Sequence, residues 1–230
     1  MTRRDLLRAV LPGLVVSGLA VWAFAGLLDA LLEQEDLYVV DQPLVDWLAS
    51  HRTEWLTTTL TAITNAFGPV ILPIVVGVVC AIWGARSRQW RDPLLLAGAM
   101  VLSTLIAMIV KAIIERPRPD ESLQVIPGLE TSFSFPSGHT TGAATLVLVL
   151  GYLVLRRRHP RKSLVAWAVL SVVVIVLVGG SRLYLGYHFF TDVLAGASLG
   201  VFTLGLVASV DRWLDLRERA AREADGAAQR

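Results

Sequence analysis

The 230-residue sequence has few charged residues, few aromatic residues and a single cysteine. Charged residues make up 17% of the chain and aromatic residues 8%, whereas 54% of it is hydrophobic. The lone Cys80 excludes an internal disulfide, and packing accounts for it because it lies in an apolar run. A net charge of +2, with no stretch of basic and aromatic residues, excludes a nucleic-acid-binding surface. A mean hydropathy of +0.60 excludes an ordinary soluble domain and indicates a membrane protein.

Apolar runs long enough to cross a bilayer recur along the chain. We predict six spans, at about residues 9–32, 68–85, 93–114, 139–155, 164–178 and 188–210. The first run could be a secretory signal, because Ala23-Phe24-Ala25 resembles a cleavage site and Thr2-Arg3-Arg4 faintly resembles a twin-arginine signal. Its length, and the spans that follow it, favour an uncleaved first helix.

The mixed segment 33–67 has apolar residues at helical spacing. They are Leu44, Trp47, Leu48 and Trp55. This spacing predicts an amphipathic helix that lies in the membrane interface, and a plain connecting loop is the alternative. Taken together, the pattern predicts an all-α polytopic membrane protein. Residues 1–210 form one six-helix membrane domain, and residues 211–230 form a polar cytoplasmic tail that is a solvated, fraying helix.

The basic residues predict how the chain crosses the membrane. Six spans place both termini on one side, and most of the 21 basic residues lie in the segments on that side. By the positive-inside rule that side is cytoplasmic, so we predict a multi-pass protein of the cell membrane. The basic residues that belong to the other side, or to adjoining helix ends, are Arg52, Lys111, Arg116, Arg118 and Arg182. Because topology disfavours cations there, their presence near two histidines points to a function.

A polar turn, Ser134-Phe135-Pro136-Ser137-Gly138-His139, opens directly into the fourth apolar run. Helix N-termini present unpaired backbone N–H groups and the positive end of a dipole, so they bind anions. Ser137 is a suitable N-cap, Gly138 lets a ligand approach the backbone, and His139 can donate a proton near neutral pH. We interpret this turn as half of a phosphate site, and a capped helix start with an incidental histidine is the alternative.

Asp192 lies inside an apolar helix, where a carboxylate is costly unless it is paired. His188 precedes it by four residues and therefore shares its helical face. A carboxylate bonded to one imidazole nitrogen fixes the tautomer and leaves the other nitrogen free to act as a base or nucleophile. A purely structural pair, or an Asp192 bridged to Arg182, remains the alternative.

Each remaining polar residue also has a simpler explanation. Lys111 could extend to the interface, Arg116 and Arg118 could bind lipid headgroups, Arg182 could be an interfacial anchor and Ser181 an ordinary cap. Their joint presence at helix ends on one membrane face favours a shared site.

These residues also have the spacing of a known signature, and the chain resembles the type 2 phosphatidic acid phosphatases. The signature reads Lys, six residues, Arg-Pro; then Pro-Ser-Gly-His; then Ser-Arg, five residues, His, three residues, Asp. Here it is Lys111 to Arg118-Pro119, Pro136 to His139, and Ser181-Arg182 with His188 and Asp192. All three parts are complete and in order. Arg116-Pro117 is a second Arg-Pro, but it lies two residues too close to Lys111.

The resemblance implies a six-helix membrane phosphatase that removes phosphate from lipid phosphates or pyrophosphates at the outer membrane face. Candidate substrates are undecaprenyl pyrophosphate, phosphatidic acid and phosphatidylglycerol phosphate. His188 would form a phospho-histidine, oriented by Asp192, and His139 would protonate the leaving oxygen. The phosphate would be bound by Lys111, Arg118, Ser137, Gly138, Ser181 and Arg182.

Three fixed cations can fill the role often given to Mg²⁺, so we predict no metal and no other cofactor. The acids Glu115, Asp120, Glu121 and Glu130 make no recognisable ligand set, and we expect them to be solvated loop residues. A vanadate-dependent haloperoxidase shares these motifs but is soluble, and a non-catalytic lipid-phosphate binding or transport protein is the other alternative. The lipid bilayer and the lipid substrate are the partners we predict; oligomeric state does not follow from the sequence.

Overall fold

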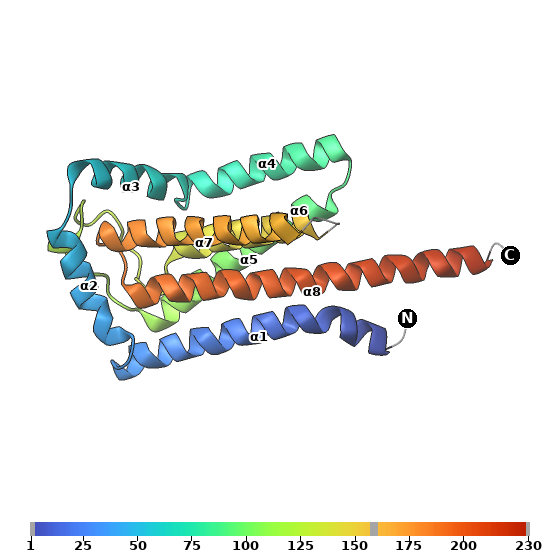
Figure 1. Ribbon diagram of the computed structural model, residues 1–230, viewed down its shortest axis with the longest axis horizontal. Helices are drawn as coiled ribbons and strands as arrows, with labels where there is room; N and C mark the ends of the chain where they lie inside the picture. Colours follow the sequence, from blue (N-terminus) through green and yellow to red (C-terminus); the bar gives the residue numbers. More distant parts are fainter. Residues whose placement is uncertain (1–2, 157–160, 229–230) are drawn as a thin grey trace.

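The structure, a computed structural model, describes residues 3–156 and 161–228, and the regular structure of these residues is entirely helical. The helices are α1 (Arg3–Glu33), α2 (Tyr38–Ser50), α3 (Glu54–Ala66), α4 (Ile71–Ser87), α5 (Arg91–Ile114), η1 (Glu121–Leu123), α6 (Gly138–Leu155), α7 (Arg161–Tyr184) and α8 (Phe190–Ala228). All the α-helices except α2 run along the long axis of the molecule (Figure 1). The short helix α2 crosses one end of the bundle, which we call the α2 end; both chain termini lie towards the opposite end (Figure 1).

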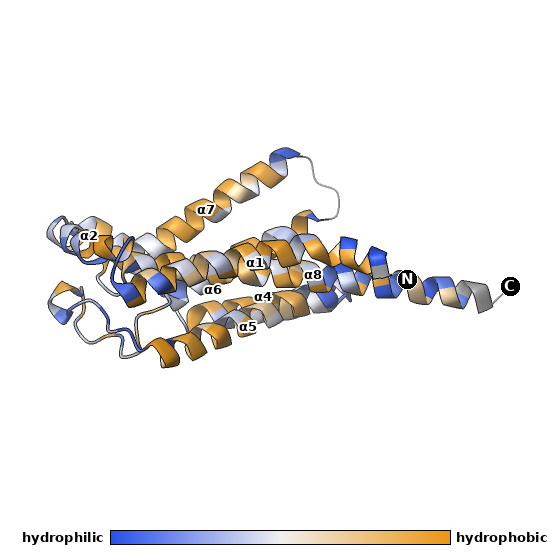
Figure 2. Ribbon diagram, turned by 90° about the horizontal axis from the view of Figure 1, so that it is seen from below, coloured by the Kyte–Doolittle hydropathy of each residue, from blue (hydrophilic) through white to orange (hydrophobic). Residues whose placement is uncertain are grey.

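Five of the described helices, α1, α5, α6, α7 and α8, are long and apolar enough to cross a membrane. Helices α3 and α4, bent by 48° at their junction, supply a sixth span if they are counted together. Hydrophobic residues cover the middle of the bundle, and hydrophilic residues gather towards its two ends (Figure 2). These findings confirm the all-α membrane fold that the apolar runs predict.

The segment between the first two spans contains two helices rather than one. The face of α2 that packs inward carries Asp41 and Val45, which are 2% and 0% exposed, while Trp47 lies on the outer face. Helix α3 then runs towards α4 and stops just before Gly68-Pro69. Proline lacks a backbone N–H and restricts the residue before it, which explains the break at this point. If the bent pair is counted as one span, that span begins at Glu54, earlier than the predicted residue 68.

Helix α8 lies between α1 and α6, and small residues allow the close contact with α1. A side chain added at Gly205 would lie 2.5 Å from the carbonyl oxygen of Gly13. Nearby, the Ser17 hydroxyl donates a hydrogen bond to the Phe202 carbonyl (3.0 Å) and the Ser209 hydroxyl donates to the Val10 carbonyl (3.1 Å). Small residues and hydroxyl hydrogen bonds of this kind are what hold helices together in lipid, where burial of apolar surface no longer drives association.

A buried ion-pair network joins α5, α6 and α8 at the end opposite α2. Asp211 is fully buried and pairs with Arg91 (2.8 Å) and with Arg156 (3.1 Å). The Tyr152 hydroxyl donates to the same carboxylate at 2.9 Å. Asp211 is the first residue of the tail expected to be solvated, and that expectation is wrong for it. Helix α8 continues without a break through this position to Ala228.

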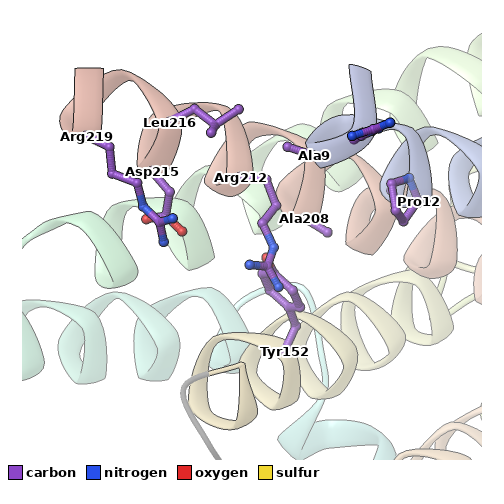
Figure 3. A pocket seen from close by; sticks show the side chains of 10 residues that line it. Ala9, Pro12, Tyr152, Ala208, Arg212, Asp215, Leu216 and Arg219 are labelled. Carbon is purple, nitrogen blue, oxygen red and sulfur yellow. The ribbon is translucent and has the colours of Figure 1, made fainter. Parts of the chain in front are cut away.

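A cavity of about 410 Å³ also lies at this end, between α1, α6 and α8 (Figure 3). Tyr152, Arg212 and Asp215 are among the residues that line it. No residue predicted to bind or transform a substrate is among them. Those residues lie at the α2 end of the bundle.

Candidate active site

His188 and Asp192 form the pair that their spacing predicts. His188 lies in the short connection after α7, and Asp192 lies in the first turn of α8. The imidazole Nδ1 is 3.2 Å from Asp192 Oδ2, and the two side chains are 1% and 0% exposed. The same carboxylate oxygen accepts hydrogen bonds from the backbone N–H of Phe189 (2.9 Å) and from the Ser134 hydroxyl. The histidine is therefore held by a carboxylate that is itself fixed by its neighbours.

The contacts of His188 define its tautomer. Arg118 Nη1 lies 3.2 Å from Nε2 of His188, and a guanidinium group can only donate hydrogen bonds. Nε2 therefore accepts, which leaves the ring proton on Nδ1 facing Asp192. Burial lowers the pKa of His188 well below its ordinary value, and the positive charges of Arg118 and Arg182 lower it further. The ring is consequently neutral at physiological pH, with an unprotonated Nε2 directed at the arginines.

Glu130 joins the two arginines that the signature assigns to phosphate binding. Its Oε2 lies 2.7 Å from Arg118 Nη2, and its Oε1 accepts from Arg182 Nη2. Burial alone would raise the pKa of Glu130, but the two guanidinium groups outweigh that effect and lower it to about 2. The expectation that Glu130 is a solvated loop acid is wrong, because its carboxylate is the bridge between Arg118 and Arg182.

Arg182 lies in the last turn of α7, not in a loop after it, because the helix extends to Tyr184. Its side chain is 2% exposed, with Nη1 donating to the Thr64 hydroxyl of α3 at 2.9 Å and the guanidinium 4.6 Å from the Tyr187 ring centroid. These contacts contradict both alternatives for Arg182, an interfacial anchor and a bridge to Asp192. Its Nε is buried without a hydrogen-bond partner.

Lys111 and the start of α6 lie beside this cluster. The Lys111 ammonium donates to the carbonyls of Phe133 and Ser134, so it holds the loop before α6. The backbone N–H of Ser137 donates to the Asp192 carbonyl at 3.0 Å and joins the start of α6 to α8. Gly138 is exposed, with nothing within 4 Å of the position that a side chain would take, so its backbone is open to a ligand.

The two histidines have the same charged neighbours. His139 is half-buried in the first turn of α6. Arg118, Arg182, Lys111 and Glu130 are the charged side chains that act on the ring of His139, and the same four act on His188. The structure therefore brings both imidazoles to one group of charges at the α2 end.

Two predicted phosphate ligands point elsewhere. The Ser181 hydroxyl is buried and donates to the Val178 carbonyl within its own helix (2.7 Å). Ser137 occupies the N-cap position of α6, but its side chain makes no capping hydrogen bond. Its buried hydroxyl instead accepts from the Thr140 hydroxyl at 3.0 Å. Both hydroxyl groups are therefore bonded within the protein, whereas the backbone of Gly138 remains open.

Arg116 was missed as a site residue. Rather than contacting lipid headgroups, it is 5% exposed and pairs with Asp192 Oδ1 (2.6 Å) and with Asp41 Oδ2 (2.7 Å). Ser134 and Asp41 were missed as well. One signal could have found Asp41, since it lies one helical turn before the apolar Val45 and so shares the buried face of α2.

A cavity of about 490 Å³ opens next to this network, between the ends of α1 and α5 and helix α2. Tyr38, Arg116, Arg118 and Phe189 line it together with apolar residues such as Leu31. Within the described ranges, no three or more His, Cys, Asp or Glu side chains form a group that could hold a metal ion. The arrangement can bind an oxyanion between fixed cations, beside an unprotonated histidine nitrogen.

A membrane-spanning bundle that gathers guanidinium groups and a neutral histidine at one rim defines a class, the integral membrane proteins that act on an anionic group at the edge of the bilayer. The model of the PAP2 superfamily matches residues 92–215, which include every residue of the signature. The chain belongs to this superfamily and is a phosphatase that hydrolyses phosphoric esters.

Relatives of known activity agree with this assignment. The chain is 33% identical over 196 residues to a phosphatidylglycerophosphatase B of Bacillus subtilis (strain 168), covering 84% of this chain and 93% of that protein. The crystal structure of a transmembrane PAP2-type phosphatidylglycerolphosphate phosphatase from Bacillus subtilis matches with a TM-score of 0.73 and 32% identity, over 84% of this chain and 95% of the other. An undecaprenyl-diphosphatase of the same strain is 26% identical over 127 residues, or 54% of this chain and 61% of that protein.

Proposed function

We propose that this protein removes a terminal phosphate from membrane lipids through a phospho-histidine formed on His188. The observation that carries the proposal is the carboxylate of Glu130, whose two oxygens form ion pairs with Arg118 and Arg182. Two arginines from different segments thus converge on one oxyanion next to Nε2 of His188. A lipid phosphate in the place of that carboxylate would meet forked guanidinium donors, which match phosphate geometry.

A phosphate group fits this position better than a carboxylate does. Glu130 leaves Nε of Arg182 buried and without a partner. A phosphate has a third oxygen that can accept from it, and the open backbone of Gly138 at the N-terminus of α6 adds a further donor. Phosphoryl transfer depends mainly on positioning and charge stabilisation, and these groups supply both.

The reaction has two steps. In the first, Nε2 of His188 attacks phosphorus, the P–O bond to the lipid breaks, and His139, protonated once the negatively charged phosphate is bound beside it, gives its proton to the leaving oxygen. In the second, a water attacks phosphorus, the P–N bond to His188 breaks and returns its electron pair to Nε2, His139 takes a proton from the water, and inorganic phosphate leaves. Arg118 must first release Nε2, which it contacts at 3.2 Å, and turn its donors to the phosphate. His188 keeps its Nδ1 proton, which it donates to Asp192, and the carboxylate stabilises the positive charge that develops on the ring.

We place the site on the outer side of the cell membrane, with both termini in the cytoplasm, because basic residues gather at the opposite end. The names of relatives support the substrate class we propose, since they include phosphatases of phosphatidylglycerol phosphate and of undecaprenyl diphosphate. Undecaprenyl pyrophosphate, phosphatidic acid and phosphatidylglycerol phosphate are therefore the lipids to test. Their common feature is a terminal phosphate on a membrane-anchored alcohol or phosphate.

The test is phosphate release by the detergent-purified protein from this panel of lipids. His188→Ala and His139→Ala should each lower kcat/KM at least about 100-fold, since general acid–base groups contribute that much or more. His51→Ala is the matched control, because His51 is exposed and stacks only on Trp47 of α2. Wild-type rates in both site variants would refute the assigned roles.

Two further measurements test the phospho-histidine intermediate and the prediction that no metal is required. Labelled lipid quenched in alkali should leave phosphate on wild-type protein and none on the His188→Ala variant. EDTA should leave the wild-type rate unchanged, because the fixed cations supply the charge that a metal would otherwise provide. Loss of activity with EDTA, restored by a divalent cation, would refute the metal-free mechanism.

A further inference from the structure

The two oxygens of the Asp192 carboxylate serve different partners. Oδ2 faces His188 and accepts from the Phe189 backbone and the Ser134 hydroxyl. Oδ1 faces away from the histidine and pairs with Arg116 Nη1 at 2.6 Å. The plane of this carboxylate, and with it the direction of the histidine ring, therefore depends on where the guanidinium of Arg116 lies.

Arg116 also contacts Asp41 and Thr191. Its Nη2 pairs with Asp41 Oδ2 at 2.7 Å, and its Nη1 also donates to the Thr191 hydroxyl at 2.7 Å. The guanidinium lies 4.2 Å from the centroid of the Phe189 ring. One buried cation thus lies between two buried carboxylates, and removal of either leaves its charge partly uncompensated.

Asp41 joins this chain of contacts to the first turn of α8. Its Oδ1 accepts from the backbone N–H of Thr191 at 2.9 Å, and its Oδ2 accepts from the Thr191 hydroxyl at 2.5 Å. A negative charge at the N-terminus of a helix is favourable, because the N–H groups there lack partners within the helix. Helix α2, which crosses the end of the bundle (Figure 1), therefore holds both Arg116 and the turn that follows His188.

We propose that Asp41 is a positioning residue of the reaction: through Arg116 it orients Asp192, and through Asp192 it directs Nε2 of His188 at the phosphorus. The inference rests on the proposed function, since it assigns α2 a part in the phosphatase chemistry of the same site. Asp41 is 2% exposed and reaches Asp192 only through Arg116 and Thr191, so its loss should change the reacting geometry more than lipid binding.

The test is steady-state kinetics of Asp41→Asn, with the lipid that the wild type hydrolyses fastest and rates expressed per folded molecule. We expect kcat to fall about 10- to 100-fold, the effect of a small misplacement of a reacting group, with KM unchanged. Because Asp41 acts through Arg116, the double variant with Arg116→Gln should be no slower than Arg116→Gln alone. Wild-type kcat in Asp41→Asn, or losses that multiply in the double variant, would overturn the inference.

Two control variants distinguish a positioning role of Asp41 from a general loss of stability. Asp46→Asn removes an exposed carboxylate from the same helix and should leave kcat unchanged. Asp211→Asn breaks an equally buried ion-pair network at the opposite end and should lower the unfolding temperature without lowering kcat. An equal fall of kcat in either control would overturn the positioning role.

If Asp41→Asn does not fold, Thr191→Val tests the same connection, since it removes the hydroxyl shared by Asp41 and Arg116 and keeps the volume. A lower kcat with unchanged KM supports the inference, and a wild-type kcat overturns it. The two proposals fail differently. A wild type that releases no phosphate from any lipid overturns the proposed function and this role together, whereas an active wild type with an equally active Asp41→Asn overturns this role alone.

Discussion

The carboxylate of Glu130 forms ion pairs with Arg118 and Arg182, the two arginines that the proposed function assigns to the phosphate of the lipid. Its lowered pKa, about 2, keeps this carboxylate ionised at any pH at which the protein would be assayed. The site therefore already contains an anion that belongs to the chain. Under the proposed function, phosphate would replace the carboxylate of Glu130 at the two arginines.

We accordingly predict that Glu130→Gln strengthens inhibition by orthovanadate, a phosphate mimic. A hydrogen bond to a charged group contributes about 1.5–3 kcal/mol, so loss of the competing charge should lower the inhibition constant about tenfold or more. The measurement is orthovanadate inhibition of phosphate release. Glu121→Gln, which changes an exposed acid of the same loop, should leave the constant at its wild-type value. Unchanged or weaker inhibition of Glu130→Gln would contradict the competition.

Helices α6 and α8 are in close contact at Gly196, one turn after Asp192. A side chain added at Gly196 would lie 2.6 Å from the Ser137 carbonyl oxygen and 3.1 Å from Thr140 Cβ. One of these atoms belongs to the backbone at the start of α6, so it cannot move without shifting that helix. The hydrogen bond from the Ser137 N–H to the Asp192 carbonyl depends on the same contact.

Gly196→Ala should therefore lower stability by about 1–3 kcal/mol, the usual cost of overpacking, and should lower kcat because α6 and α8 move apart. Thermal unfolding in detergent and phosphate release measure the two effects. Gly77→Ala on α4 is the matched control, because nothing lies within 4 Å of the added carbon. A fully active and stable Gly196→Ala would show that α6 and α8 tolerate a shift at this contact.

Hydropathy predicts most of these helices, because a long apolar run has few alternatives in a membrane. Hydropathy misplaces the end of a helix where a residue that usually ends helices is instead needed for contact with another helix. The pair Gly179-Gly180 suggests an end to the fifth span, yet α7 continues to Tyr184 because Gly179 makes room for Val193 of α8. Arg182 consequently lies on a helix, in a position that no local pattern indicates.

In the candidate site, too, the sequence predicts some contacts and not others. The His188–Asp192 pair is predictable because both residues lie within one helical turn. Arg116 and Asp41 meet across 75 residues, and Asp41 and Thr191 across 150, so their contacts depend on how α2 crosses the end of the bundle. Glu130 lies in a loop without periodicity, and no spacing rule connects it to Arg118 and Arg182.

The proposed orientation of the chain in the membrane can be tested by cysteine labelling. Cys80 is the only cysteine of the sequence, so its replacement by serine gives a cysteine-free background. In that background Ser50→Cys lies at the α2 end and Gln89→Cys lies between α4 and α5 at the opposite end, and both positions are exposed. A membrane-impermeant maleimide added to intact cells should label Ser50→Cys and leave Gln89→Cys unlabelled until the cells are lysed. The reverse pattern would place the site in the cytoplasm.

Each of the two buried ion-pair networks includes an aspartate of α8. Asp192 and Asp211 are both on α8, and at 1.5 Å per residue they are about 28 Å apart along its axis. The hydrocarbon core of a bilayer is about 30 Å thick. Helix α8 therefore carries two buried carboxylates that are separated by about the thickness of this core. A shift of α8 by one turn along its axis would break the ion pairs of both aspartates at once. Because α8 is anchored to its neighbours near both ends of this stretch, the separation of the two networks should stay the same when the thickness of the bilayer changes.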